Sequence, residues 1–155
     1  MTKVLMVCLG NICRSPMAEG ILIHKINQRN LAIEVDSAGT GNYHVGEHPD
    51  SRAIATAKKF GIDISGLIAR QFTSNDFSIF DCILVMDSSN AKNVLELASS
   101  DEDKSKVKMF LEFSDRKDKN VPDPWFGNNN GFVDVFKMLE VACEGFLKSE
   151  TNFIK

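Results

Sequence analysis

The sequence predicts an α/β fold, in which a parallel sheet is covered by helices on both faces. Short apolar runs rich in β-branched residues alternate with longer stretches of helical periodicity, an order typical of parallel sheets connected by helices. The 155 residues are 43% hydrophobic and 25% charged, which suits one globular domain over residues 1–155. Right-handed connections leave the loops that follow the strands at one edge of such a sheet, where ligands bind.

The first half of the chain predicts two strands, each followed by a helix. Residues 3–7 are apolar and β-branched, as in a buried strand. Pro16 then suits the first turn of a helix, because its missing N–H costs nothing there, and the helix ends near Asn30. Residues 33–39 predict the second strand. After a polar loop, Ser51 is the expected N-cap of the second helix.

The second half repeats this pattern. A short helical piece near Thr73 precedes a third buried strand at residues 82–86. The next helix is capped by Asp87 or Ser88, and residues 106–110 predict a short fourth strand. The last helix is predicted from apolar residues at helical spacing: Phe132, Phe136, Leu139, Cys143 and Phe146.

Charge and composition exclude several classes of function. The net charge of −3 argues against bulk electrostatic binding to nucleic acid. No apolar run is long enough to cross a bilayer, and the first nine residues are too soon interrupted to act as a signal peptide. We therefore expect a cytoplasmic protein with no nucleic-acid or membrane partner, whose four cysteines are free thiols.

The loop after the first strand reads VCLGNICRSP, residues 7–16, and combines a nucleophile with an anion site. A loop curled from Cys8 to Arg14 can aim backbone N–H groups at one anion, and the following helix adds its positive end. Gly10 and Asn11 are residue types that tolerate the positive φ of a tight loop. Arg14 can hold two phosphoryl oxygens in a bidentate fork, and these positive groups favour a Cys8 thiolate that attacks phosphorus.

A proton donor for the leaving group is expected in the loop before the last helix. Asp115 and Asp118 lie in a run of alternating charges and are expected to be solvated. Asp123 lies between two prolines that fix the backbone, beside Trp125 and Phe126, whose apolar surfaces limit the access of water. Asp123 is therefore the predicted general acid.

Four motifs resemble those of the low-molecular-weight protein tyrosine phosphatases: VCLGNICRSP at 7–16, DSAGT at 36–40, MDSSN at 86–90 and DPWFG at 123–127. The resemblance covers essentially the whole chain. It implies a four-stranded parallel sheet and the activity EC 3.1.3.48, a two-step hydrolysis that needs no metal or other cofactor. Cys8 would form a phosphocysteine, while Asp123 would protonate the leaving phenol and then activate water.

The resemblance also implies the residues that bind the substrate. Phosphate would be held by Arg14 and by the loop residues Leu9, Gly10, Asn11, Ile12, Cys13 and Ser15. Asn11 would hold the shape of the loop and Ser15 would assist the thiolate. Tyr43 and Trp125 lie on loops expected at the same edge, where two aromatic walls would sandwich a phenyl ring.

The expected partners are phosphotyrosine-containing proteins, with inorganic phosphate as product, and the chain is expected to be a monomer or weak homodimer. The resemblance suggests a reversible disulfide between Cys8 and Cys13, although Cys13 could equally serve only to fill space. The chain departs from the family pattern in two places. Many members have two tyrosines where this chain has Trp125 and Phe126, and a histidine where it has Leu67.

Other readings of the cysteines, histidines and charged residues are less favoured. An arsenate reductase could use the same cradle but needs relay cysteines, whereas Cys82 and Cys143 are isolated and expected in the core. A non-catalytic phosphotyrosine-binding module would need neither the nucleophile nor the acid. His44 and His48 lack the further ligands of a metal site. The charged run over residues 101–108 is expected to be a solvated edge.

Overall fold

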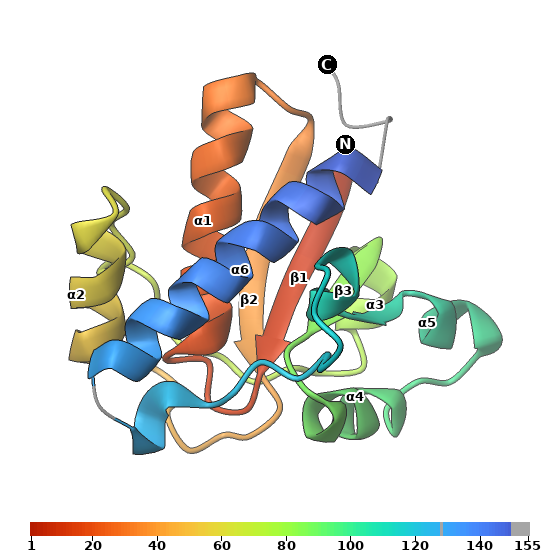
Figure 1. Cartoon of the computed structure of the whole chain (residues 1–155). Helices are drawn as coiled ribbons and strands as arrows, with labels where there is room; N and C mark the ends of the chain where they lie inside the picture. Colours follow the sequence, from red (N-terminus) through yellow and green to blue (C-terminus); the bar gives the residue numbers. More distant parts are fainter. Residues whose placement is uncertain (128, 150–155) are drawn as a thin grey trace.

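A parallel sheet with the strand order β2-β1-β3-β4 forms the centre of the structure (Figure 1). The structure is a computed structural model and describes residues 1–127 and 129–149. Strand β1 (Thr2–Cys8) pairs in parallel with β2 (Ile33–Gly39) on one side and with β3 (Cys82–Val85) on the other, and β4 (Val107–Met109) lies beyond β3. The predicted fold class and its four strands are confirmed.

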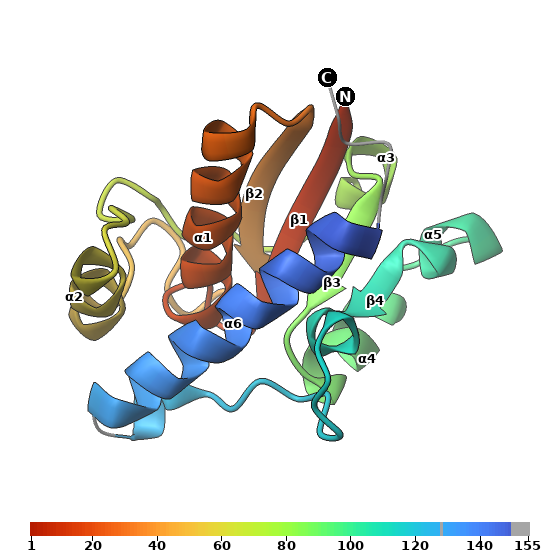
Figure 2. The ribbon, with the colours of Figure 1, turned by 45° about the horizontal axis from the view of Figure 1, so that its top comes forward.

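Helices cover both faces of this sheet. One face carries α1 (Arg14–Arg29), α2 (Ser51–Lys59) and α6 (Asn129–Ser149), and the other carries α3 (Asp76–Ile79) and α4 (Ser88–Leu95). In Figure 2, α6 crosses the sheet diagonally with α1 beside it. The short elements are α5 (Asp101–Ser105), η1 (Phe110–Phe113) and η2 (Pro124–Phe126).

The alternation of side chains along β1 explains the two-sided core. Val4 and Met6 face α1 and α6, whereas Leu5 and Val7 face the opposite cluster, which contains Phe77 of α3. All four β1 residues are fully buried, as expected for a strand covered on both faces. A continuous apolar run in the sequence therefore supplies both halves of the core.

Most predicted elements are found, with two corrections. Asp50 rather than Ser51 caps α2, because its carboxylate accepts a hydrogen bond from the backbone N–H of Arg52 at 2.8 Å. The charged run over residues 101–108, predicted as a solvated edge, is largely exposed but not irregular. Its first five residues form the short helix α5, and its last two begin β4. For α4, the choice between two caps is resolved in favour of Asp87.

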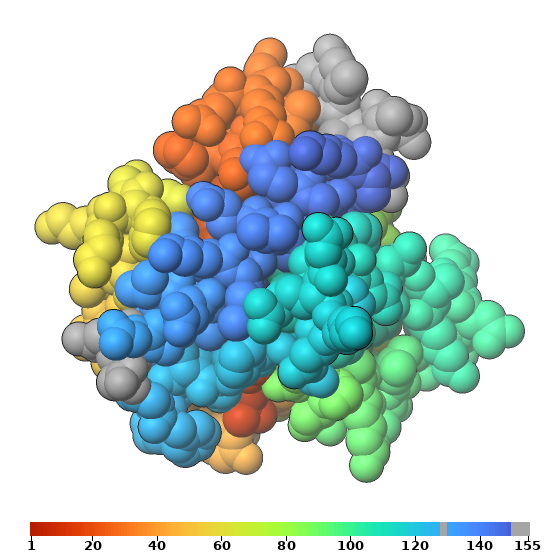
Figure 3. Space-filling view, viewed as in Figure 1, coloured from red at the N-terminus to blue at the C-terminus, as the bar shows by residue number. Residues whose placement is uncertain are grey.

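The carboxyl ends of the strands define the edge where the site lies. β1 ends at Cys8, which is paired with Gly39 at the end of β2. The chain leaves β1 for β2 on one side and returns to β3 on the other, and this reversal opens a crevice for ligands. In the space-filling view, red atoms from the start of the chain reach the surface at the lower edge, beside light-blue and green segments (Figure 3). Among the described residues, no helix has the length and apolar character needed to span a bilayer.

Candidate active site

The loop from Cys8 to Ser15 forms the floor of a pocket at this edge. Within residues 1–127 and 129–149, the backbone N–H groups of Gly10 and of residues 12–15 donate to no protein acceptor. Asn11 N–H donates to Cys8 Sγ at 3.3 Å. The 16-residue helix α1 starts at the end of this loop and adds its positive N-terminus. Unpaired donors beside a helix N-terminus can bind an oxyanion.

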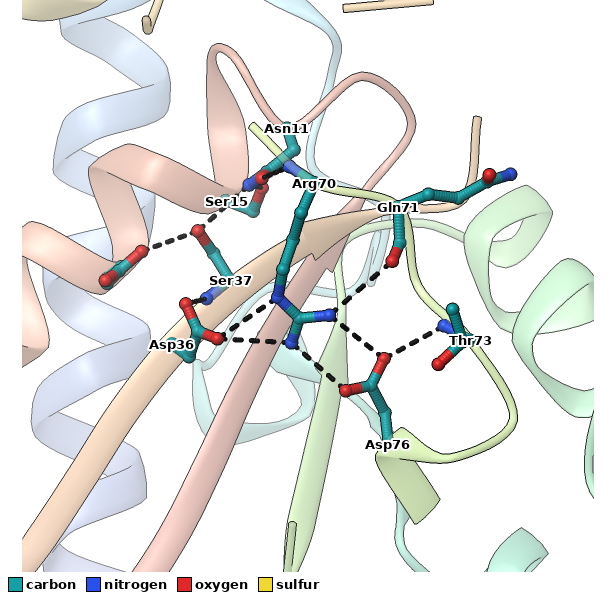
Figure 4. Close-up of polar contacts among 9 residues, drawn as sticks. Asn11, Ser15, Asp36, Ser37, Arg70, Gln71, Thr73 and Asp76 are labelled. Atoms are coloured by element: carbon teal, nitrogen blue, oxygen red, sulfur yellow. Dashed lines mark hydrogen bonds and ion pairs between the residues drawn. The ribbon is translucent and has the colours of Figure 1, made fainter. Parts of the chain in front are cut away.

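Asn11 connects the loop to β2 and to Arg70 through its side chain (Figure 4). Its side chain is buried and donates through Nδ2 to Ser15 Oγ at 2.8 Å and to Ser37 Oγ at 2.9 Å. Its Oδ1 accepts a hydrogen bond from the backbone N–H of Arg70 at 3.0 Å. Asn11 has φ 58°, whereas Gly10 does not have positive φ, so only one of the two predicted residues adopts this conformation.

These bonds also orient Ser15 beside the nucleophile. Ser15 Oγ accepts a hydrogen bond from Asn11 and lies 3.0 Å from Cys8 Sγ; because a thiolate has no hydrogen to give, Ser15 is the donor when Cys8 is ionised. A hydroxyl that donates to sulfur stabilises a thiolate. The predicted assistance of Ser15 therefore has a defined geometry.

The same hydrogen bonds connect the loop to charged groups beneath it. Ser37 Oγ donates to Glu19 Oε1 at 2.5 Å, and burial raises the pKa of this carboxyl to about 7. The Arg70 guanidinium lies between Asp36 and Asp76, with N–O distances of 3.1 Å to each (Figure 4). Because Arg70 is held on both sides, its backbone N–H offers Asn11 a fixed donor.

Arg14 lies on the inner wall of the pocket and is buried. Its Nη1 donates to Asp87 Oδ2 at 2.6 Å and to Val121 O at 2.9 Å. Burial lowers the pKa of the guanidinium, but the negative charges of Cys8, Asp123 and Asp87 outweigh that effect and raise the pKa above its ordinary value. Arg14 is therefore a permanent cation in a fixed orientation.

Asp123 lies opposite this cation. Its Oδ1 accepts a hydrogen bond from Trp125 N–H at 3.0 Å, and its Oδ2 is 3.6 Å from Arg14 Nη2. The side chain is 29% exposed, so it remains accessible to a substrate. Asp115 and Asp118 are exposed, as predicted.

The pocket has an apolar rim above this polar floor. His44 and Phe126 line it, and so do most of the predicted site residues. These are Cys8, Leu9, Gly10, Ile12, Cys13, Arg14, Tyr43, Asp123 and Trp125. Tyr43 and Trp125 are 73% and 43% exposed, so both rings are available to a ligand. Trp125 also packs edge-on against Phe126, with ring centroids 4.9 Å apart. Asn11 and Ser15 are the two predicted residues that lie beneath the floor instead of lining it.

The other cysteines and the histidines occupy different environments. Cys13 is buried, and burial followed by the charges of Asp50 and Cys8 raises the pKa of its thiol well above the usual value. Cys143 is fully buried, whereas Cys82 is only half-buried at the start of β3. In the described part of the chain, no group of three or more His, Cys, Asp or Glu side chains could hold a metal ion.

Three contributors to the site were not predicted as such from the sequence. Asp87 follows the third predicted strand as Cys8 follows the first, so its position at the carboxyl end of a strand is the signal that indicates this carboxylate. Ser37 and Arg70 carry no comparable signal, because only the fold brings them to Asn11.

Comparison with known proteins connects this geometry to a family. The sequence profile described as "Low molecular weight phosphotyrosine protein phosphatase" matches residues 3–152. A Schizosaccharomyces pombe protein of that name is 42% identical over 151 residues, covering 95% of this chain and 96% of its own. The crystal structure of a protein tyrosine phosphatase from Entamoeba histolytica, with Hepes in the active site, superposes with a TM-score of 0.91. It is 38% identical and covers 96% of both chains. A Drosophila arginine phosphatase has a TM-score of 0.90 at 35% identity, covering 96% of this chain and 97% of its own.

Proposed function

Because the chain belongs to the low molecular weight phosphotyrosine protein phosphatases (EC 3.1.3.48), we propose that it hydrolyses phosphotyrosine and small aryl phosphates through a phosphocysteine. The convergence of Cys8, Arg14 and Asp123 on one pocket carries this proposal. The pocket combines a nucleophile, a phosphate-binding cation and a proton donor, which are the three groups that such a reaction needs.

In the first step, Cys8 Sγ attacks phosphorus and the bond from phosphorus to the phenolic oxygen breaks. Asp123 donates its proton to that leaving oxygen. Arg14 and the unpaired amides of the loop bind the equatorial phosphoryl oxygens, where negative charge is concentrated in the transition state. The product of this step is a phosphocysteine and a free phenol.

In the second step, the Asp123 carboxylate takes a proton from water, and the water oxygen attacks phosphorus. The S–P bond breaks, inorganic phosphate leaves and the Cys8 thiolate is restored. A hydrogen bond from Ser15 Oγ, 3.0 Å from Sγ, stabilises the departing sulfur, because a thiolate can only accept.

The apolar rim favours an aryl ester. Tyr43 and Trp125 offer ring faces to a phenyl group, and a phosphate at the floor below them suits the long side chain of phosphotyrosine better than that of phosphoserine. The similarity to an arginine phosphatase adds phosphoarginine as a second candidate substrate. A guanidinium, however, offers several donors, and Asp123 is the one carboxylate among the residues that line the pocket in the described structure.

Arsenate reduction is disfavoured by the positions of the remaining cysteines. Cys82 pairs with Val4, four residues before Cys8, which puts it roughly 13 Å from the end of the strand. Cys143 is enclosed in the core on α6. Cys13 is the one further cysteine that lines the pocket, and we propose that it forms a disulfide with Cys8 under oxidation, which would protect the nucleophile.

Hydrolysis of p-nitrophenyl phosphate, with EDTA and without added metal, tests the proposal. Cys8→Ser should abolish activity, and Asp123→Ala should lower it by ~10²–10⁴. Asp118→Ala is the matched control, because this carboxylate is exposed in the same loop. Equal effects of the two aspartate substitutions would reject Asp123 as the acid. A reduced wild-type enzyme that binds phosphotyrosine without hydrolysing it would instead support a binding module, and faster turnover of phosphoarginine would support the alternative substrate.

A further inference from the structure

Arg52, the second residue of α2, connects the two loops that form the site. Its Nε and Nη2 bond to the Asp50 carboxylate at 3.0 and 2.9 Å. Its Nη2 also donates to Trp125 O at 3.1 Å, and its Nη1 donates to Gly127 O at 3.3 Å. The guanidinium lies over the ring of Phe132 in α6, with its central carbon 4.7 Å from the ring centroid.

Asp50 joins this arrangement to the phosphate loop. Its backbone N–H donates to Ile12 O at 2.8 Å, so the start of α2 is fixed against the loop that contains Cys8. Its carboxylate in turn orients Arg52 through two hydrogen bonds. A continuous set of contacts thus runs from the phosphate loop through Asp50 and Arg52 to the carbonyls at 125 and 127.

Those carbonyls belong to the turn from Asp123 to Gly127 and lie downstream of the acid. Upstream of Asp123, Val121 is bonded to both Met86 and Arg14. Downstream, Gly127 N–H bonds to Pro124 O within the turn, Pro124 is buried, and Arg52 donates to the carbonyls of Trp125 and Gly127. The acid is therefore held on one side by the sheet edge and on the other by the buried Pro124 and by the hydrogen bonds of the Arg52 guanidinium.

We propose that Arg52 is a positioning residue for the general acid: it holds the turn from Asp123 to Gly127 against the phosphate loop. The inference rests on the proposed function, with Asp123 as the acid. Arg52 does not line the pocket, so it acts through the turn and not on the substrate. A planar guanidinium can bond a carboxylate and two carbonyls at once, which a lysine ammonium on a flexible stem cannot reproduce in the same geometry.

Misplacement of an acid by about 1 Å can cost ~10²-fold in rate. That cost depends on the leaving group, because an acidic phenol departs without much help from a proton donor whereas a weakly acidic phenol requires one. Arg52→Gln should lower kcat/KM for phenyl phosphate by roughly 10–10²-fold and that for 2,4-dinitrophenyl phosphate by much less. A general loss of folded enzyme would lower both values equally.

The experiment measures kcat/KM over a series of aryl phosphates for wild type, Arg52→Gln and Arg52→Lys, and for Arg116→Gln as the matched exposed control. The proposal predicts a steeper dependence on leaving-group pKa for Arg52→Gln, a smaller change for Arg52→Lys and none for the control. If Arg52→Gln does not fold, Arg52→Lys provides the same comparison, because it keeps the positive charge near Phe132.

The same series in an Asp123→Asn background separates this proposal from the proposed function. There Arg52→Gln should add no further leaving-group dependence, because no acid remains to be positioned. An additional effect in that background, or an equal loss for every ester in the wild-type background, would overturn the role of Arg52. An Asp123→Asn enzyme with unchanged leaving-group dependence would instead overturn the assignment of Asp123 as the acid.

Discussion

Asn11 and Asn30 share a backbone conformation but differ in their side-chain contacts, which makes them a matched pair. Both lie in the left-handed region, with φ 58° and φ 52°. Asn11 is buried and makes three side-chain hydrogen bonds, whereas Asn30 is exposed at the C-terminus of α1. Substituting each by alanine therefore separates the backbone cost from the value of the bonds.

The magnitudes can be worked out from these contacts. An alanine in the left-handed region costs about 1 kcal/mol, and this cost applies to both variants. Asn11→Ala also removes three hydrogen bonds, two of them buried, each worth about 1 kcal/mol net, and leaves the Arg70 N–H without its acceptor. We expect losses of about 1 kcal/mol for Asn30→Ala and about 4 kcal/mol for Asn11→Ala.

Urea unfolding at equilibrium, monitored by far-UV circular dichroism and Trp125 fluorescence, measures both free energies. The two probes should give coincident transitions if unfolding is two-state. Losses for the two variants that agree within about 0.5 kcal/mol would refute the reasoning, because the three bonds would then contribute nothing beyond the backbone term.

Two carboxyl groups and one glycine provide further tests. Since the pKa of Glu19 is raised from 4.5 to about 7, its contribution to stability is complete below pH 4.5 and is lost as the pH rises through 7. The free energy of unfolding in urea of Glu19→Gln, relative to that of wild type, should rise by up to roughly 3 kcal/mol from pH 5 to pH 8. A difference between the two proteins that does not change with pH would contradict this. Hydrogen bonds from two cations of α1 lower the pKa of Glu144 to about 2, so its stabilisation is present above pH 4.5 and is lost as the pH falls through 2. Glu144→Gln should therefore lower Tm at pH 6 but not at pH 2, and an equal decrease at both would count against the ion pair. A Cβ on Gly145 would clash with the backbone carbonyl oxygen of Phe113, so Gly145→Ala should lower Tm despite a helix-propensity gain of about 1 kcal/mol, and an unchanged Tm would contradict this packing.

The elements that could be predicted from the sequence are those with a local signal. Residues 33–39 show the apolar, β-branched character of a strand, and the structure has β2 over the same residues. The helix that begins near Pro16 and ends near Asn30 was also found, because proline and asparagine favour the first turn and the left-handed C-cap respectively. The short α5 helix, which the sequence analysis does not predict, carries a local signal: Ser100 Oγ accepts a hydrogen bond from Asp103 N–H, a cap typical of a serine followed three residues later by an acid.

The site could be predicted only as far as its residues are close in sequence or follow a strand. The loop from Cys8 to Ser15 is contiguous, so its chemistry is visible in ten residues. The link from Asn11 to Ser37 spans 26 positions, and that from Arg52 to Trp125 spans 73, so both depend on the packing of separate elements. Sequence patterns identify the residues that react, whereas the contacts that hold them in place depend on tertiary structure.

The direction of the hydrogen bonds around Cys8 has a practical consequence for capturing substrates with an inactive enzyme. Asn11 N–H donates to Sγ, and the Ser15 hydroxyl donates to it when Cys8 is a thiolate. The hydroxyl introduced by Cys8→Ser could accept from Asn11 N–H and direct its own hydrogen either to Ser15 Oγ or into the pocket, where it adds a donor for bound phosphate. Cys8→Ala adds no such donor and removes the acceptor that both groups require. The two inactive enzymes therefore differ as traps, and the alanine form should hold its ligand through Arg14 and the loop amides alone.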